Sequence, residues 1–240
     1  MRNPETRDEW IKTMAIKLCV KGDNGAEKKV LDVSAGAKPY EHVWKDAGCS
    51  YSSSEFAGNT NLVDTFRGES GTKKYLERLH TYVGDDITNT NAPNSTFDIV
   101  LFTEVLEHLP EPAKAIPELA RVAKPGASIL ITAPFTSGSH QLPYHFSSGY
   151  SREWYHYMAK QNGLEVQSID TQGDYFRLMA QETNRVLTCT PKLPNTDADF
   201  LQQVRETLHY HLLALSNVHG KGGGCADDFT IGWMAHLKKP

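Results

Sequence analysis

The feature that most constrains the fold is the segment 30–40, VLDVSAGAKPY, in which an apolar run ends at Asp32 and gives way to small residues. This pattern is typical of a buried parallel strand that leads into a tight turn beneath a small-molecule cofactor. A second strand-like run, GCSYSSSEF, carries an acidic residue, Glu55. A carboxylate about 20 residues beyond such a turn can reach a bound ribose from the tip of the neighbouring strand. The sequence therefore predicts a nucleotide-cofactor site at one edge of a parallel sheet.

Strand-like segments alternate with helical segments along the chain. Expected strands lie near 29–33, 50–55, 82–87, 97–102, 128–133, 164–169 and 229–237. Expected helices lie near 5–19, 39–46, 111–123, 175–190 and 198–218, with a further helix that Ser151 caps. This alternation favours an α/β fold with a doubly wound, mostly parallel sheet. Because two helices precede the last strand, we expect that strand to insert antiparallel and to complete a seven-stranded sheet.

Composition excludes several classes of partner. The 240 residues carry a formal net charge of −4 and no long basic run, whereas binding to nucleic acid depends on clustered Lys and Arg. No apolar run approaches the ~20 residues of a membrane span, and the N-terminus lacks the apolar core of a signal peptide. We therefore expect no nucleic-acid partner, no membrane partner and a cytoplasmic location.

The four cysteines are Cys19, Cys49, Cys189 and Cys225, and no pair of them forms a CxxC motif. At this chain length a disulfide framework is not expected, and a reducing compartment is the default. The histidines at 209, 211 and 219 have no carboxylate pattern around them, so surface or packing roles are favoured over a metal site. The sequence predicts no metal.

Four segments in fixed order resemble the class I S-adenosylmethionine-dependent methyltransferases. They are VLDVSAGAKPY, SSSEF, GDDI followed by FDIVLFTEVLEHL, and AKPGASILITAPF. The resemblance covers about residues 28–170 and implies a Rossmann-like core with S-adenosylmethionine as cofactor and S-adenosylhomocysteine as product. It places an N-terminal helical cap at 1–27, the cofactor-binding core at 28–170, a helical insertion near the substrate site at 171–227 and the last core strand at 228–240.

The resemblance also assigns residues to the cofactor. Backbone at the first turn would approach the methionine part, Glu55 the ribose hydroxyls, Phe56 and Ile87 the adenine ring, and Asp86 the adenine amino group. Residues at the tip of the FDIVLF strand would lie beside the methionine chain, and Arg7 and Trp10 would close over the cofactor. The full implied cofactor set is Asp32, Ser34, Ala35, Gly36, Glu55, Phe56, Asp86, Ile87, Thr103 and Glu104.

One departure from the family pattern concerns the first turn. Family turns read GxGxG, whereas this chain has Ser34, Gly36 and Lys38 at the corresponding places. Ser and Lys adopt positive φ less easily than Gly does. We therefore expect a turn of different shape and a modest affinity for the cofactor.

The loop 134–150, PFTSGSHQLPYHFSSGY, follows the SILITA strand at the sheet edge where open α/β folds bind ligands. His140 and His145 on this loop are candidate general bases, since imidazole suits that role near neutral pH. Loop-stabilising hydrogen bonds are an equal alternative, and His108 is expected to bond locally. The candidate acceptor wall comprises Tyr144, Tyr150, Arg152, Tyr175 and Phe176.

The predicted function is methyl transfer from S-adenosylmethionine to a small-molecule acceptor by a monomer or homodimer, with the accepting atom open. Two alternatives remain: a non-catalytic protein that binds S-adenosylmethionine, and an NAD(P)-dependent oxidoreductase. The oxidoreductase pattern expects a third glycine where this chain has Lys38-Pro39. A nucleic-acid methyltransferase is disfavoured because TEVLEHLP stands where a (D/N)PP(Y/F) element would be expected.

Overall fold

A computed structural model describes residues 6–20, 25–55, 81–83, 87–189, 197–219 and 229–240. Within these residues, one mixed sheet has the strand order β3-β2-β1-β4-β5-β7-β6. The strands are β1 (Lys29–Asp32), β2 (Ser50–Glu55), β3 (Tyr82–Val83), β4 (Phe97–Thr103), β5 (Ala123–Pro134), β6 (Glu165–Gln172) and β7 (Gly232–Lys238). Neighbouring strands from β3 to β5 pair in parallel, whereas β7 runs antiparallel to both β5 and β6. The last strand is therefore antiparallel, as the sequence predicts.

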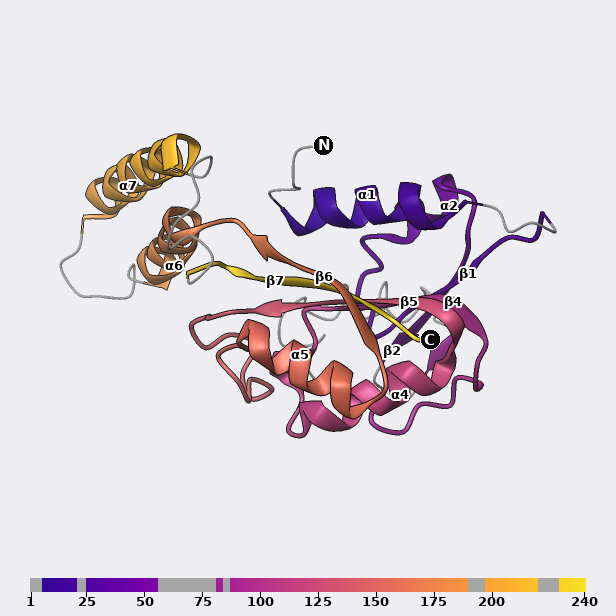
Figure 1. Ribbon diagram of the computed structural model, residues 1–240. Helices are drawn as coiled ribbons and strands as arrows, with labels where there is room; N and C mark the ends of the chain where they lie inside the picture. The colour runs from indigo at the N-terminus through magenta and orange to yellow at the C-terminus, as the bar shows by residue number, and fades with distance from the viewer. Residues whose placement is uncertain (1–5, 21–24, 56–80, 84–86, 190–196, 220–228) are drawn as a thin grey trace.

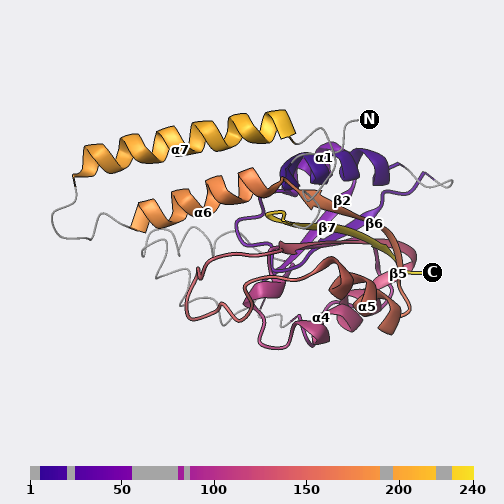
Figure 2. The same cartoon turned by 60° about the vertical axis from the view of Figure 1, so that its left-hand side comes forward.

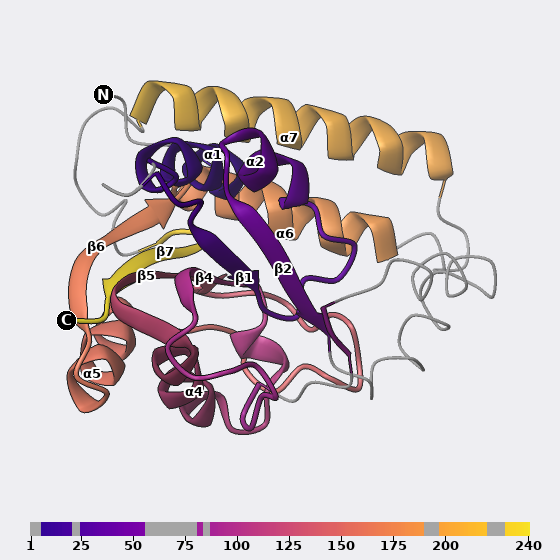
Figure 3. The same cartoon turned by 90° about the vertical axis from the view of Figure 1, so that its right-hand side faces the viewer.

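Helices cover both faces of the sheet. The helices are α1 (Arg7–Leu18), α2 (Glu41–Asp46), α4 (Ala115–Val122), α5 (Arg152–Gln161), α6 (Tyr175–Cys189) and α7 (Ala198–His219). Figures 1 and 3 show α1 and α2 on one face of the sheet and α4 and α5 on the opposite face. Among the described residues no helix is long and apolar enough to cross a membrane.

Local sequence explains where these helices begin. The Ser151 hydroxyl accepts a hydrogen bond from the Trp154 backbone N–H at 3.3 Å, which is the capping contact expected at the start of α5. Pro117 lies in the first turn of α4, where the missing N–H of proline leaves no helical bond unmade. The predicted helix 111–123 therefore starts late, at Ala115, after a short 3₁₀ turn at Pro112–Lys114.

The central strand β4 shows why the sheet is buried on both faces. Val100 and Phe102 pack into the core that α4 and α5 cover, whereas Ile99 and Leu101 pack into the core beneath α1 and α2. Successive side chains of a strand point to opposite faces, so a strand with helices on both sides needs a continuous apolar run. The run FDIVLF meets that need and fixes β4 in the middle of the sheet.

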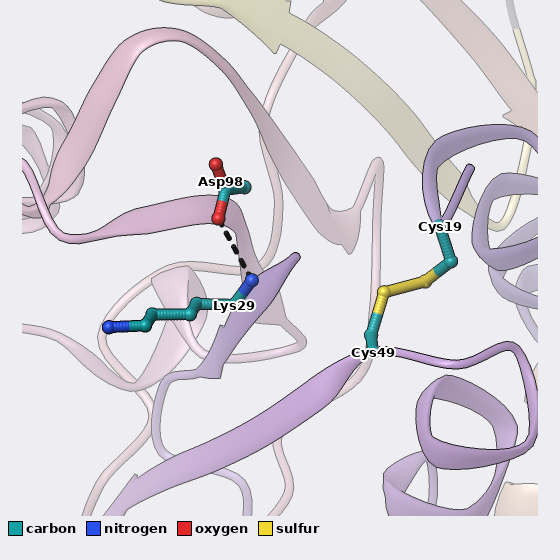
Figure 4. Close-up of a disulfide and its surroundings, with 4 residues drawn as sticks. All are labelled: Cys19, Lys29, Cys49 and Asp98. Carbon is teal, nitrogen blue, oxygen red and sulfur yellow. Dashed lines mark hydrogen bonds between the residues drawn. A yellow bond between two sulfur atoms is a disulfide. The ribbon is translucent and has the colours of Figure 1, made fainter. Parts of the chain in front are cut away.

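The sequence-based expectation of no disulfide is wrong at one place. Cys19, which follows α1, and Cys49, which precedes β2, form a disulfide bond (Figure 4). Both cysteines lie in the core beneath α1 and α2, and 30 residues separate them in sequence. The packing of α1 across the sheet brings the two thiols together, and no local sequence motif predicts this pairing.

Helices α6 and α7 form an antiparallel pair between β6 and β7 in the chain (Figure 2). Gln172 ends β6 opposite Gly232 of β7, which in turn pairs with Pro134 at the end of β5. The pair thus follows the edge of the sheet at which the parallel strands end. The Ser216 hydroxyl of α7 donates to the Asp174 carboxylate at 2.7 Å and accepts from Arg177 Nε at 3.1 Å, which joins the two helices.

Candidate functional site

Three residues of the turn after β1 have positive φ angles. Ser34, Gly36 and Lys38 have φ angles of 52°, 53° and 54°. Ser and Lys thus adopt the positive φ angles that glycine adopts more easily, and each such non-glycine residue costs on the order of 1 kcal/mol. The Ala35 N–H bonds to the Ser54 carbonyl at 3.0 Å, which anchors the turn to the end of β2.

The carboxylate at the end of β2 lies directly against this turn. Oε2 of Glu55 accepts a hydrogen bond from the Gly36 backbone N–H at 2.8 Å, and Glu55 is buried. A Cβ built on Gly36 would meet no heavy atom within 4 Å, so the outer side of the turn is open for a close approach. The sequence prediction that Gly36 and Glu55 share one site is consistent with this geometry.

Asp32, at the end of β1, is buried beneath the same turn. Its Oδ2 accepts a hydrogen bond from the Tyr51 hydroxyl at 2.6 Å, and its Oδ1 has no hydrogen-bond partner among the described residues. Burial raises the pKa of Asp32 to about 7, the Tyr51 hydrogen bond opposes that rise and the nearby Glu55 carboxylate adds to it. Asp32 therefore carries a polar oxygen that a bound ligand or water can satisfy.

Glu104, at the tip of β4, is held in a strained conformation. It has a φ of 55°, and its backbone N–H bonds to the Thr132 carbonyl at 2.9 Å. Its side-chain Oε1 accepts from the Thr132 hydroxyl at 2.8 Å and lies 3.4 Å from Arg7 Nη1. Because Arg7 also donates from Nε to the Tyr40 hydroxyl at 2.8 Å, α1 is tied across the carboxyl edge of the sheet.

The other predicted cofactor residues have varied placements. Phe56 and Asp86 lie outside the described residues. Ile87 is buried in the core under α4 and α5, and Thr103 is half-buried at the end of β4, opposite Thr132. Trp10 is buried beneath α1, so of the two residues expected to close over the cofactor only Arg7 reaches the site edge.

Imidazole rings gather where the loop 134–150 meets the turn after β4. The ring centroids of His108 and His140 are 5.1 Å apart, those of His140 and His145 are 4.7 Å apart, and those of His108 and His145 are 6.3 Å apart. Burial lowers the pKa of His108 and of His145, and the neighbouring imidazoles lower both further. Both shifts favour the neutral form of these two rings.

His108 does not bond locally as expected. Its Nδ1 bonds to the Tyr144 backbone carbonyl, 36 residues away. Beside it, the Glu107 carboxylate is 1% exposed, and its Oε2 has no hydrogen-bond partner among the described residues. Burial and the Glu104 carboxylate raise the pKa of Glu107 to about 8. The sequence prediction did not include Glu107 and gave His108 only a local bond, although the spacing Glu104-xx-Glu107-His108 could have indicated a cluster.

The loop 134–150 is closed by backbone contacts at its ends. The Tyr150 N–H bonds to the Pro134 carbonyl at 2.9 Å. A Cβ on Gly149 would lie 2.1 Å from the Phe135 carbonyl oxygen, so only glycine allows the strands of the loop to approach this closely. Helix α6 holds the loop from outside: Arg185 donates to the Gly138 carbonyl at 2.8 Å.

The residues predicted to line the acceptor are dispersed. Tyr150 is buried, and its hydroxyl donates to the Leu106 carbonyl at 2.8 Å. Tyr144 is half-buried on the loop, whereas Arg152 is exposed in the first turn of α5. Tyr175 and Phe176 begin α6, with their ring centroids 5.6 Å apart. Tyr144 and the histidines are thus brought together, and no contact joins Arg152 to them among the described residues.

The comparisons agree with this architecture. A family model described as "Methyltransferase domain" matches residues 31–131. A ubiquinone biosynthesis O-methyltransferase of Hahella chejuensis is 33% identical over 112 residues, which are 44% of this chain and 42% of that protein. A similar enzyme of Vibrio parahaemolyticus is 30% identical over 114 residues, 47% of this chain and 46% of that protein. The chain thus matches less than half the length of these curated relatives.

Solved structures share the fold. A putative sarcosine dimethylglycine methyltransferase from Galdieria sulphuraria superposes with a TM-score of 0.56 and 16% identity, covering 97% of this chain and 84% of that one. The matched family domain spans β1 to β5, which carry Asp32, the turn and Glu104. The family match over residues 31–131, the curated relatives and the shared fold together indicate a class I S-adenosylmethionine-dependent methyltransferase.

Proposed function

We propose that the protein transfers a methyl group from S-adenosylmethionine to an oxygen of a small-molecule acceptor. The main support for S-adenosylmethionine as the cofactor is the turn at residues 34–38. This turn has three positive φ angles, and its Gly36 N–H donates to the Glu55 carboxylate. The names of the curated relatives, both O-methyltransferases, support oxygen as the accepting atom. When bound, the cofactor supplies a methyl group on a sulfonium, which is already an activated leaving group.

The residues of this chain fit such a cofactor in chemistry. Glu55 would accept hydrogen bonds from the ribose hydroxyls, and the open side of Gly36 allows backbone to approach the ligand. Ser34, Ala35 and Asp32 complete the turn beneath it. The unpaired Oδ1 of Asp32 offers an acceptor for an ammonium group or for a water that binds one.

Further cofactor contacts are proposed at the neighbouring strand ends. Thr103 and Glu104 would lie beside the amino-acid part of the cofactor, where the Glu104 carboxylate attracts an ammonium group. Phe56, Asp86 and Ile87 are proposed for the adenine. The Arg7–Glu104 contact at 3.4 Å lets α1 cover this end of the site.

The acceptor would lie against the loop 134–150, since α6 and the turn after β4 border the same loop. His140 and His145 are the proposed proton acceptors, and His145 is favoured because its Nε2 is buried without a partner among the described residues. Tyr144, Tyr175 and Phe176 would contribute to the wall. Tyr150 would support it through its bond to Leu106, and Arg152 is proposed to meet a substrate carboxylate.

The proposal is tested by calorimetry and by turnover. We expect S-adenosylhomocysteine to bind the purified protein and NAD not to bind. With S-adenosylmethionine labelled on the methyl group, a panel of phenols and alcohols should yield at least one labelled ether. Binding of NAD in place of S-adenosylhomocysteine would favour the oxidoreductase alternative, and cofactor binding without any methylated product would favour the non-catalytic one.

A further inference from the structure

We propose that Glu107, His108 and His140 form a binding site for a divalent transition-metal cation on the acceptor side of the protein. Each of these residues offers one ligand atom, and the three atoms lie within 4.8 Å of one another. Ligand atoms at about 2.0–2.2 Å from one ion lie at most ~4 Å apart, so a small rotation of a side chain closes the site. Two segments far apart in sequence, the turn after β4 and the loop 134–150, supply the three side chains.

The hydrogen bonds of the two imidazoles leave the metal-binding nitrogens free. A backbone carbonyl can only accept, so the contact between His108 Nδ1 and the Tyr144 carbonyl places the ring proton on Nδ1. The Nε2 lone pair then points to Glu107, whose Oε1 lies 3.7 Å from it. Histidines that ligate metals commonly donate their other ring N–H to a carbonyl or carboxylate in this way.

His140 has the same arrangement. Its Nδ1 lies 3.0 Å from the Gly138 carbonyl, 3.3 Å from the Ser137 hydroxyl and 3.3 Å from Arg185 Nη1. The Ser137 hydroxyl and the Arg185 guanidinium both already donate to the same carbonyl, at 3.1 Å and 2.8 Å. The shortest contact of the ring is with the carbonyl, which again places the proton on Nδ1. Nε2 of His140 is therefore the atom available to a ligand.

The burial of Glu107 is a second, independent observation that points to a ligand at this place. Its carboxylate is 1% exposed, and Oε2 has no hydrogen-bond partner among the described residues. A buried polar group without a partner is costly, and a buried carboxylate is tolerated when it is paired or bound to a metal. Nε2 of His145 is likewise buried without a partner within the described part of the chain, and its ring lies tilted beside that of His140. A cation between Glu107, His108 and His140 would satisfy the carboxylate.

The ligand set selects the class of ion. Two imidazoles and one carboxylate suit Zn²⁺, Fe²⁺ and related transition cations, whereas Mg²⁺ and Ca²⁺ prefer oxygen ligands alone. Three protein ligands leave coordination positions open, as in catalytic rather than structural sites. The site therefore has room for an oxygen of a small molecule.

The consequence for catalysis rests on the proposed function. A cation lowers the pKa of a hydroxyl that binds it. The acceptor hydroxyl would lose its proton to His145 Nε2, and the oxygen lone pair would form the new O–CH₃ bond. The C–S bond of the cofactor would break with its electron pair passing to sulfur, so that charge and atoms balance. The predicted acceptor class is an alcohol or phenol that coordinates the ion.

Metal binding can be measured without turnover. The full chain, with any histidine tag removed, is stripped with a chelator and titrated with Co²⁺ in thiol-free buffer, following visible absorption, and with Zn²⁺ in a calorimeter. We expect one equivalent to bind. Glu107→Gln and His140→Ala should each weaken binding at least about tenfold. His211→Ala, which changes an exposed histidine on α7, is the matched control and should bind like the unchanged protein.

Binding of S-adenosylhomocysteine to each stripped variant is the second measurement. Retained binding shows that Glu107→Gln and His140→Ala are folded, and their loss of metal then supports the site. The inference is overturned if the unchanged protein binds neither ion, or if His140→Ala and His211→Ala bind metal equally well. Should the metal bind while S-adenosylhomocysteine does not, the site stands and the proposed function fails.

Discussion

The proposed cofactor side and the proposed acceptor side of the site are built in different ways. On the cofactor side, the turn 34–38 and the end of β2 present backbone N–H groups and one buried carboxylate, Glu55, which the Gly36 N–H already contacts. On the acceptor side, side chains from separate segments meet, and buried polar atoms of Glu107 and His145 lack partners among the described residues, as Oδ1 of Asp32 does on the cofactor side. The first side is shaped by the backbone in advance, whereas the second is a set of side chains that a ligand would complete.

The largest effect that separates the two sides is expected from His145→Ala. If His145 accepts the proton of the acceptor, kcat should fall by about 10²–10⁴-fold, the usual contribution of a general base. Affinity for S-adenosylhomocysteine should stay unchanged because the residue lies on the acceptor side. Turnover is measured with labelled S-adenosylmethionine and affinity by calorimetry. Undiminished turnover in His145→Ala would remove this residue from the mechanism.

Asp32→Asn should change the pH dependence of stability. Burial raises the folded-state pKa of Asp32 to about 7, above the ordinary value of 3.8, so the folded protein favours the neutral acid. That stabilisation is fully present below about pH 4 and is lost as the pH rises toward 7. A difference of about 3 pKa units corresponds to at most about 4 kcal/mol.

Urea unfolding of the two proteins between pH 4 and 8 measures this difference. Relative to Asp32→Asn, the unchanged protein should lose stability across that range. If the free energy of unfolding changes with pH by the same slope in both proteins, Asp32 titrates as an ordinary exposed carboxyl. The cofactor side would then hold no acid whose pKa is raised by burial.

Glu55→Gln tests the carboxylate against the turn. Hydrogen bonds to a charged group contribute about 1.5–3 kcal/mol, so affinity for S-adenosylhomocysteine should fall by about ten- to 100-fold. Glu182→Gln is the matched control, because that carboxylate contacts the loop at Gly138, on the acceptor side. If both variants bind the product equally, Glu55 has no role at the ribose.

The smallest effect is expected from Ser34→Gly. Glycine adopts a φ of 52° without the cost that a side chain carries there, so the variant should be more stable by up to about 1 kcal/mol. Affinity for S-adenosylhomocysteine should rise or remain equal, since the turn keeps its shape. Thermal unfolding and calorimetry measure both quantities. A lower stability of Ser34→Gly would indicate that the serine side chain makes a stabilising contact that outweighs its backbone strain.

Much of the fold could be predicted because its signals are local. The apolar run of β4, the Ser151 cap and the late start of α4 around Pro117 depend on residues within one or two turns of chain. The segment AKPGA has the composition of a turn, and it lies within the bounds of β5. The register with β4 jumps from Ala123 to Ser128, and Gly126 has a φ of 80°, so the segment is an irregularity in the ladder that keeps its turn character.

The sequence by itself determined the order of strands and helices, the place of the first turn and the acidic residue, Glu55, at the end of the neighbouring strand, because periodicity and spacing carry this information. Only the tertiary structure decided that Ser34 and Lys38 take glycine-like angles, that Cys19 meets Cys49, and that Glu107 and His108 lie beside His140. The contacts of Cys19 with Cys49 and of His108 with His140 join segments about 30 residues apart. The angles of Ser34 and Lys38 are set by the strands that pack against their turn. The free energy that stabilises both comes from packing of the whole chain, which no short stretch of sequence encodes.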